Sequence, residues 1–210
     1  MSKNQIALLR DLVPQRPLLY EEALRYAELQ ADRLLELAKI THPAVPESVV
    51  TNLPRLEVRR YTPFPTSGAS HFSEGKWLIA INGAEPETRQ RFSLAHELKH
   101  IIDHPGSDLY FSNFPSLERA QMIERICDYF AGCLLMPRWW VTAAHNNGTD
   151  YVHDLAAMFG VSPSAMTVRL SQIGIAGPTR RCATSPDTWP YPRAMRQRPR
   201  SHTKVPQTIH

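Results

Sequence analysis

The segment from His96 to His100 limits what this chain can fold into more than any other part of its sequence. Its pattern, H-E-x-x-H, places two imidazoles and a carboxylate at the spacing found in zinc hydrolases. Residues four apart share one face of an α-helix, so a helix here lets both histidines bind one metal ion. Glu97 then lies beside them, close enough to hold a water molecule and act as a base. The pattern predicts an active-site helix with metal ligands His96 and His100 and catalytic Glu97.

The surrounding residues favour a helix that is buried on one side. Polar residues from Thr88 to Arg91 begin it, after a turn that ends at Pro86. Apolar residues recur at helical spacing roughly opposite the two histidines, namely Leu94, Leu98, Ile101 and Ile102. The alternative is an ordinary core helix with two exposed histidines. An apolar face behind a polar face is what a buried active-site helix needs, and it favours the metal site.

Catalytic zinc usually has three protein ligands and one open position, so a third ligand is required. His104 continues the histidine face, but on a straight helix it lies about 12 Å along the axis from His96, which is too far for one ion. It is predicted instead to be a cation at the helix end or a group behind the ligands. Glu124 is the other candidate for the third ligand.

Glu124 belongs to a second predicted helix, which runs from Leu117 and is stopped by Pro137. Asp128 follows four residues later on the same face, and apolar residues occupy much of the rest. A glutamate ligand plus an aspartate that accepts the other ring N–H of a histidine would both hold and orient the ligands. The alternative, a solvated acidic pair, is not favoured by so apolar a helix. Two helices facing one ion are therefore predicted.

Two longer patterns resemble those of the ImmA/IrrE family of metallopeptidases. The first is R-F-S-L-A-H-E-L-K-H, residues 91–100, and the second is E-x-x-C-D-x-F-A-x-x-L-L-M-P, residues 124–137. The likeness covers roughly residues 18–177. Two positions depart from the family pattern, because Lys99 replaces the usual glycine and Cys127 the usual alanine. Neither change removes a ligand, although Cys127 adds a soft atom nearby.

The resemblance implies a pared-down thermolysin-type zincin. By that likeness a zinc ion, with manganese as the alternative, is held by His96, His100 and Glu124. Glu97 is the general base and Asp128 orients a ligand histidine. The implied substrate is a helix-turn-helix repressor, cut to induce the genes of a mobile element or a stress response.

Composition and spacing predict an α+β protein with three parts. Residues 1–140 form the metallopeptidase core, residues 141–177 a helical unit, and residues 178–210 a tail. The core contains a helix from Tyr20 to about Ile40 and short strands, followed by the two metal-site helices. The strands are predicted at Arg55–Tyr61, near Ser70–Ser73 and at Trp77–Ile81, the last of which is apolar on both faces and therefore buried.

The tail differs in composition from the rest of the chain. It has seven basic residues and one acidic residue, a local charge of +6 against +4 for the whole chain, and six prolines. This composition predicts a disordered segment. It is able to touch nucleic acid, but a solvating extension is favoured.

The helical unit resembles a helix-turn-helix. Gly160 closes one helix, and Ser162 and Pro163 begin the next. A helix that reads DNA should present several phosphate or base contacts, whereas this second helix offers only Arg169 among charged residues. Packing against the core or a protein partner is favoured over DNA binding.

Cysteine content and hydropathy bear on the location of the protein. No stretch approaches the ~20 apolar residues of a transmembrane helix. Three cysteines without C-x-x-C spacing predict reduced thiols and a cytoplasmic protein. No membrane partner is expected.

These features predict a zinc-dependent endopeptidase that acts on a protein substrate. Glu97 would take a proton from water and return it to the leaving amine. The extended segment Ser67–Ser73 is the candidate sheet edge for the substrate, and His71 and Tyr110 are candidates for stabilising the oxyanion. The alternatives are a regulatory protein that binds DNA or a repressor through a structural metal site, and a toxin-like partner of an antitoxin.

Overall fold

A computed structural model describes residues 4–175. They lie in one compact unit, which contains both the predicted core and the predicted helical unit, and the boundary at residue 140 stays a prediction. The predicted tail, residues 178–210, lies outside the described residues. Across residues 4–175, every helix is too short or too polar to cross a membrane.

A three-stranded sheet forms one layer of the fold. Its strands are β1 (Leu56–Tyr61), β2 (Gly68–Ser73) and β3 (Lys76–Asn82), in the order β1-β3-β2. β1 is parallel to β3, and β2 is antiparallel to it. The three predicted strands are confirmed, and β3 is the central one, with Ile79 and Ile81 fully buried. β2 is left at an edge of the sheet.

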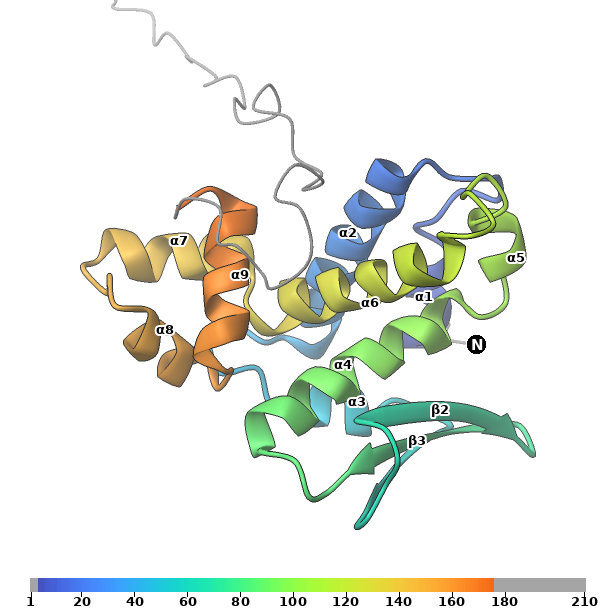
Figure 1. Cartoon of the computed structure of the whole chain (residues 1–210), viewed down its shortest axis with the longest axis horizontal. Coiled ribbons are helices and arrows are strands. Elements are labelled where there is room, and N and C mark those ends of the chain that lie inside the picture. Colours follow the sequence, from blue (N-terminus) through green and yellow to red (C-terminus); the bar gives the residue numbers. More distant parts are fainter. Residues whose placement is uncertain (1–3, 176–210) are drawn as a thin grey trace, which may run out of the picture. The chain divides into compact units, whose positions relative to one another are not determined.

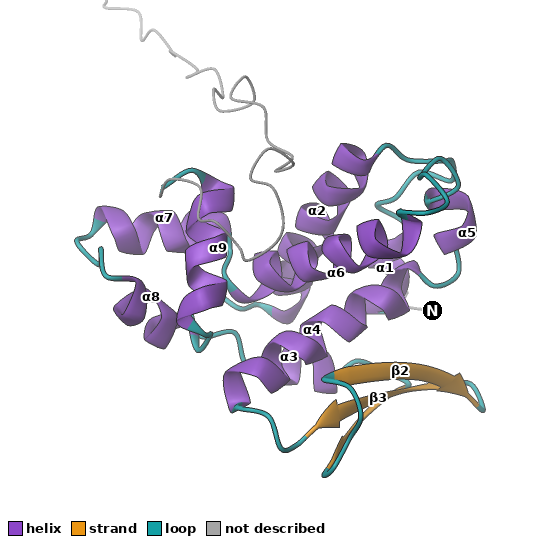
Figure 2. Ribbon diagram, in the orientation of Figure 1, coloured by secondary structure: helices purple, strands orange, loops and turns teal. Residues whose placement is uncertain are grey.

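Three long helices form the rest of the core. They are α2 (Tyr20–Ala38), α4 (Glu87–Asp103) and α6 (Arg119–Leu135). α4 contacts β2 and β3 on one side and α6 on the other, and α6 also contacts α2 (Figures 1 and 2). The short helices α1 (Gln5–Arg10), α3 (Ser48–Thr51) and α5 (Ser107–Tyr110) complete this part. The chain is therefore α+β, as predicted.

The position of α4 between sheet and helices follows from its sequence. Its apolar residues Leu94, Leu98, Ile101 and Ile102 are at most 2% exposed. A helix with both sides covered must bury part of its polar face too, and Glu97, Lys99 and Asp103 are indeed buried. Neighbouring residues of α4 thus face either the sheet or α6. Side chains from both layers can therefore meet at α4.

Three further helices follow Pro137, namely α7 (Arg138–Asn146), α8 (Val152–Phe159) and α9 (Pro163–Ile173). Gly160 ends α8 with a φ of 63°, a left-handed conformation that glycine adopts without strain. The Ser162 hydroxyl accepts a hydrogen bond from the Ala165 amide at 3.2 Å, and Pro163 is the first residue of α9. Both predicted helix ends are confirmed.

Two arginine side chains tie distant segments together. Arg91 of α4 donates to the carbonyls of Gly160, at 3.1 Å, and Val45, at 2.7 Å. Arg169 of α9 is only 1% exposed and donates to the carbonyl of Met136 at 2.9 Å. Arg169 is the one charged residue of α9, the helix at the position of a DNA-reading helix. Its side chain is therefore buried in the protein rather than exposed to a DNA partner.

Replacing Arg169 by alanine should lower the free energy of unfolding by about 3 kcal/mol or more, because it leaves the Met136 carbonyl unpaired in a buried site. Urea denaturation measures this loss. Arg33→Ala is the control, since Arg33 forms an exposed pair with Glu36 and should cost less than about 1 kcal/mol. Equal effects of the two substitutions would contradict a buried anchoring role for Arg169.

Candidate metal centre

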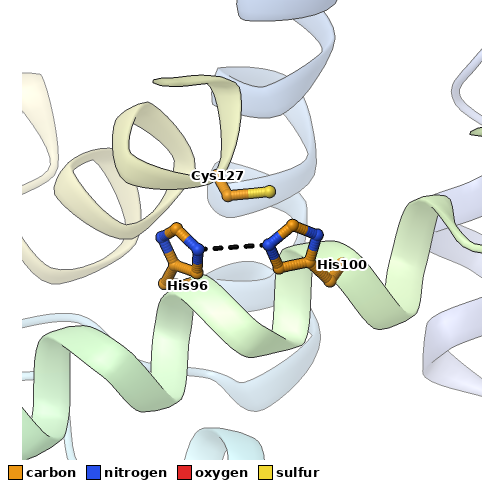
Figure 3. Close-up of side chains that lie close together, drawn as sticks. All are labelled: His96, His100 and Cys127. Carbon is orange, nitrogen blue, oxygen red and sulfur yellow. Dashed lines mark hydrogen bonds between the residues drawn. The ribbon is translucent and has the colours of Figure 1, made fainter. Parts of the chain in front are cut away.

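The site lies where α4 faces α6. α4 supplies His96 and His100, and α6 supplies Glu124, Cys127 and Asp128. Figure 3 shows the two histidine rings side by side on α4, with Cys127 reaching toward them from α6. The packing of the two helices brings together residues that are more than twenty positions apart in the sequence.

The three predicted ligands converge. The Nε2 atoms of His96 and His100 are 3.1 Å apart, and the Glu124 carboxylate lies 3.2 Å from the first and 3.4 Å from the second. Tetrahedral zinc with bonds of about 2.0–2.1 Å separates its ligand atoms by about 3.3 Å. Two ring nitrogens at 3.1 Å also need a proton or a cation between them, because their lone pairs repel. The donor set therefore fits a divalent metal ion.

Asp128 orients the first histidine. Its Oδ1 lies 3.0 Å from Nδ1 of His96, and since a carboxylate accepts, Nδ1 carries the proton and Nε2 turns toward Glu124. Burial by itself lowers the pKa of His96, but Asp128, Glu124 and Glu97 together raise that pKa above its ordinary value. The pKa of His100 is lowered, by burial and by the neighbouring His96. A neutral His100 is the form that binds metal.

The site is open on its acidic side and closed on its inner side. The side chains of Glu124 and Asp128 are about half exposed, at 57% and 47%. The side chain of His96 is 15% exposed, and Cys127 is fully buried. A substrate can therefore approach past the carboxylates, while the protein core limits access from behind.

The side chain of Glu97 lies against the sheet, where Gly68 of β2 is its neighbour. Glu97 is 8% exposed, and a Cβ atom built on Gly68 would lie 3.1 Å from its Cγ and 3.2 Å from its Oε1. A strand carrying a side chain there would push the carboxylate aside. The edge strand and the candidate base are thus in direct contact. The sequence indicated an edge at Ser67–Ser73 but not the contact of Gly68 with Glu97.

Gly68→Ala should slow any reaction in which Glu97 is the base on the order of 10-fold. This is less than the 10²-fold expected for a misplacement of about 1 Å, because the neighbour must move only by tenths of an ångström. Metal content should stay unchanged, since Gly68 touches no candidate ligand in the contacts above. Ala69→Ser, at the exposed neighbouring position, is the control. A loss of metal from the Gly68 variant would contradict this reading.

Three other histidine and tyrosine candidates are not brought to the site. His104 ends α4 and packs edge-on against Trp77, with ring centroids 5.0 Å apart. His71 is exposed and lies one position away from half-buried Ser70, so it points to the opposite face of β2. Tyr110 is buried, and its hydroxyl accepts a hydrogen bond from Gln15 at 2.9 Å. Among the contacts of the described residues, neither candidate oxyanion donor is paired with Glu97.

Lys99, the departure from the family glycine, is buried behind the site. Its ammonium donates to Asp103 at 2.6 Å and to Gln30 of α2 at 2.7 Å. The i,i+4 spacing of Lys99 and Asp103 was visible in the sequence, but the partner Gln30 was not. Burial raises the pKa of the Cys127 thiol well above its ordinary value, and Lys99 opposes that rise. The two departures from the family pattern therefore lie near each other.

Comparison with known proteins agrees with this geometry. The sequence matches the peptidase-family model described as IrrE N-terminal-like domain over residues 57–171, more than half of the chain and including both helices of the site. The chain belongs to the ImmA/IrrE family of metallopeptidases. Membership of this family implies a divalent metal, which the convergent donors of α4 and α6 fit.

Individual relatives are more distant. The radiation response metalloprotease IrrE of Deinococcus deserti is 32% identical over 93 residues, which are 42% of this chain and 29% of that relative. A solved Mycobacterium tuberculosis transcriptional regulator matches with a TM-score of 0.53 and 17% identity, covering 80% of this chain and 52% of that one. At this identity the second likeness shows the fold alone. This ImmA/IrrE member thus spans only part of the length of both.

Proposed function

We propose that this protein is a metal-dependent endopeptidase with a zincin-like core. The observation that carries the proposal is the convergence of His96, His100 and Glu124, whose ring nitrogens and carboxylate oxygens lie 3.1–3.4 Å apart. Glu97, next to His96 in sequence, lies against the edge strand β2. Ligands, base and substrate edge are the parts that peptide hydrolysis requires. Zinc is the proposed ion, with manganese as the alternative.

The roles of the side chains follow from their positions. A divalent metal held by His96, His100 and Glu124 would polarise the scissile carbonyl and lower the pKa of water. Glu97 takes the proton from the attacking water and later delivers it to the leaving amine. Asp128 keeps Nε2 of His96 directed at the centre of the site. The burial of Glu97, which is 8% exposed, limits the access of bulk water to its carboxylate.

The outer edge of β2 is the proposed substrate edge. Among the described strands, β2 pairs with β3 alone, so its other side is available to an extended peptide. Main-chain hydrogen bonds along this edge would hold the peptide. Gly68 lies over Glu97, so a peptide paired there would pass close to the base. The sequence predicted this role for Ser67–Ser73, and β2 is Gly68–Ser73.

The proposed substrate class is a helix-turn-helix repressor. The family membership and the IrrE relative, a radiation response metalloprotease, support a regulatory proteolytic role. A cytoplasmic location is part of the proposal and agrees with two free, buried thiols at Cys127 and Cys133. The helix-turn-helix-like unit formed by α8 and α9 is proposed to serve as packing or as a protein-binding surface.

The alternative of a DNA-binding regulator with a structural metal site has less support. A helix that reads DNA needs exposed cationic side chains. Arg169, the one charged residue of α9, is instead buried and donates to the Met136 carbonyl. A toxin-like partner is an alternative that no feature of the described residues favours. The half-exposed side chains of Glu124 and Asp128 also leave the centre within reach of a substrate.

The experiment is to incubate helix-turn-helix repressors from the same genome with the purified chain and zinc, and to identify fragments by mass spectrometry. Cleavage that requires metal and stops with a chelator supports the proposal. A chain shortened to residues 1–177 should cleave equally well, because every proposed ligand and base is retained. Intact substrate under all conditions, with metal bound, would favour the binding-protein alternative.

A further inference from the structure

Cys127 offers a sulfur atom to the same centre. The ligand atoms of His96, His100 and Cys127 all lie within 4.8 Å of one another (Figure 3). Cys127 stands one helical turn after Glu124, so both side chains leave the same face of α6. The carboxylate covers the solvent side of the centre and the thiol covers the core side, where Cys127 is 1% exposed.

The spacing is close to what a four-coordinate ion needs. Tetrahedral zinc, with bonds of about 2.0 Å to nitrogen and 2.3 Å to sulfur, places these two ligand atoms about 3.6 Å apart. The limit of 4.8 Å leaves the thiol at most about 1.2 Å short, a shift within reach of a side-chain rotation. Zinc binds thiolate readily, and two histidines, one glutamate and one cysteine make a complete tetrahedral set.

We infer that Cys127 is a fourth protein ligand, which occupies the coordination position that catalysis requires to be open. This inference rests on the metal site of the proposed function and adds a resting state to it. Binding of the thiol releases its proton to solvent and changes no oxidation state. An ion with four protein ligands has no position left for water, so the thiol holds the enzyme in a closed, inactive form. Water and substrate then compete with Cys127 for the ion.

Cobalt(II) is the probe, because a thiolate ligand gives it a charge-transfer band in the near ultraviolet in addition to the visible bands of tetrahedral cobalt. The full-length chain, loaded with one equivalent of cobalt(II), should show both sets of bands. Cys127→Ala, which restores the family residue, should lose the charge-transfer band and keep the visible bands. Cys133→Ala, on the same helix, and Cys182→Ala are matched controls that should retain both.

Zinc affinity and cleavage rate give the second measurement. Cys127→Ala should weaken zinc binding at least roughly 10-fold and, at saturating zinc, raise the rate of substrate cleavage, because it removes a ligand and opens the site. A residue that only fills space would not lower the zinc affinity and raise the cleavage rate at the same time. Cys127→Ser, of similar size, should behave like the alanine variant and shows that packing is not the cause.

The outcomes separate this inference from the proposed function. Visible cobalt bands without a charge-transfer band in the wild type would overturn the thiol ligand and leave the peptidase proposal standing. A charge-transfer band that depends on Cys127, without cleavage of any substrate, would support the thiol ligand and count against the peptidase. No cobalt bands at all would overturn both.

Discussion

Glu97→Gln should reduce the rate of substrate cleavage about 10²–10⁴-fold, the range typical of losing a general base. The amide has nearly the same shape as the carboxylate, so it should fit beneath Gly68 without moving β2. It cannot take a proton from water at neutral pH. Because Glu97 is not a proposed ligand, the variant should keep its metal ion and its stability.

Measurement of fragment formation by mass spectrometry, alongside elemental analysis, tests both parts of this expectation. Glu87→Gln is the matched control, because Glu87 lies exposed in the first turn of the same helix. Its rate should equal that of the wild type. Equal cleavage by wild type and Glu97→Gln would rule out Glu97 as the base, and loss of metal from Glu97→Gln would point to a ligand role instead.

Local signals in the sequence were enough to predict the main elements. The periodicity of apolar residues located α4 and α6, and the Gly160 and Ser162-Pro163 signals located the ends of α8 and α9. The H-E-x-x-H spacing placed His96 and His100 on one face, since i,i+4 proximity is a property of any helix. These predictions depend only on residues a few positions apart.

Contacts between layers could not be predicted in the same way. Nothing in the composition of β2 indicates that Gly68 lies against Glu97, because that contact depends on how the sheet packs on α4. The Gln30 partner of Lys99 is 69 residues away, and only the packed core brings the two together. His71 and Tyr110 were chosen by residue type, which carries no information on which face of an element a side chain uses.

The role of Glu124 depends partly on local sequence signals and partly on contacts between layers. Its helix was predictable from local pattern. Its pairing with the histidines was predicted from an acidic pair on an otherwise apolar helix and from the family resemblance, and it requires the packing of α6 against α4. Cys127 shows the same limit more strongly. The comparison with the family pattern marked Cys127 as a soft atom near the site. Only the packed structure shows that its sulfur and the ring nitrogens of both histidines lie within 4.8 Å of one another.

Glu124→Ala should weaken zinc binding by more than the roughly 10–100-fold typical of groups behind the ligands, because it removes the donor that lies 3.2 Å and 3.4 Å from the two histidines. His104→Ala is the control and should bind zinc nearly as well as the wild type, since His104 packs on Trp77 instead. Asp128→Ala should fall between, at about 10–100-fold, because it only orients His96.

Competition with a chromophoric chelator measures all three affinities on one scale. The ranking is the test, because general damage to the fold would lower the affinity of every variant without separating them. Thermal unfolding of the metal-free variants should be similar for Glu124→Ala and His104→Ala, since neither side chain is buried. If His104→Ala were the most damaging change, the ion would have to lie at the end of α4, and Glu124 would no longer be the third ligand.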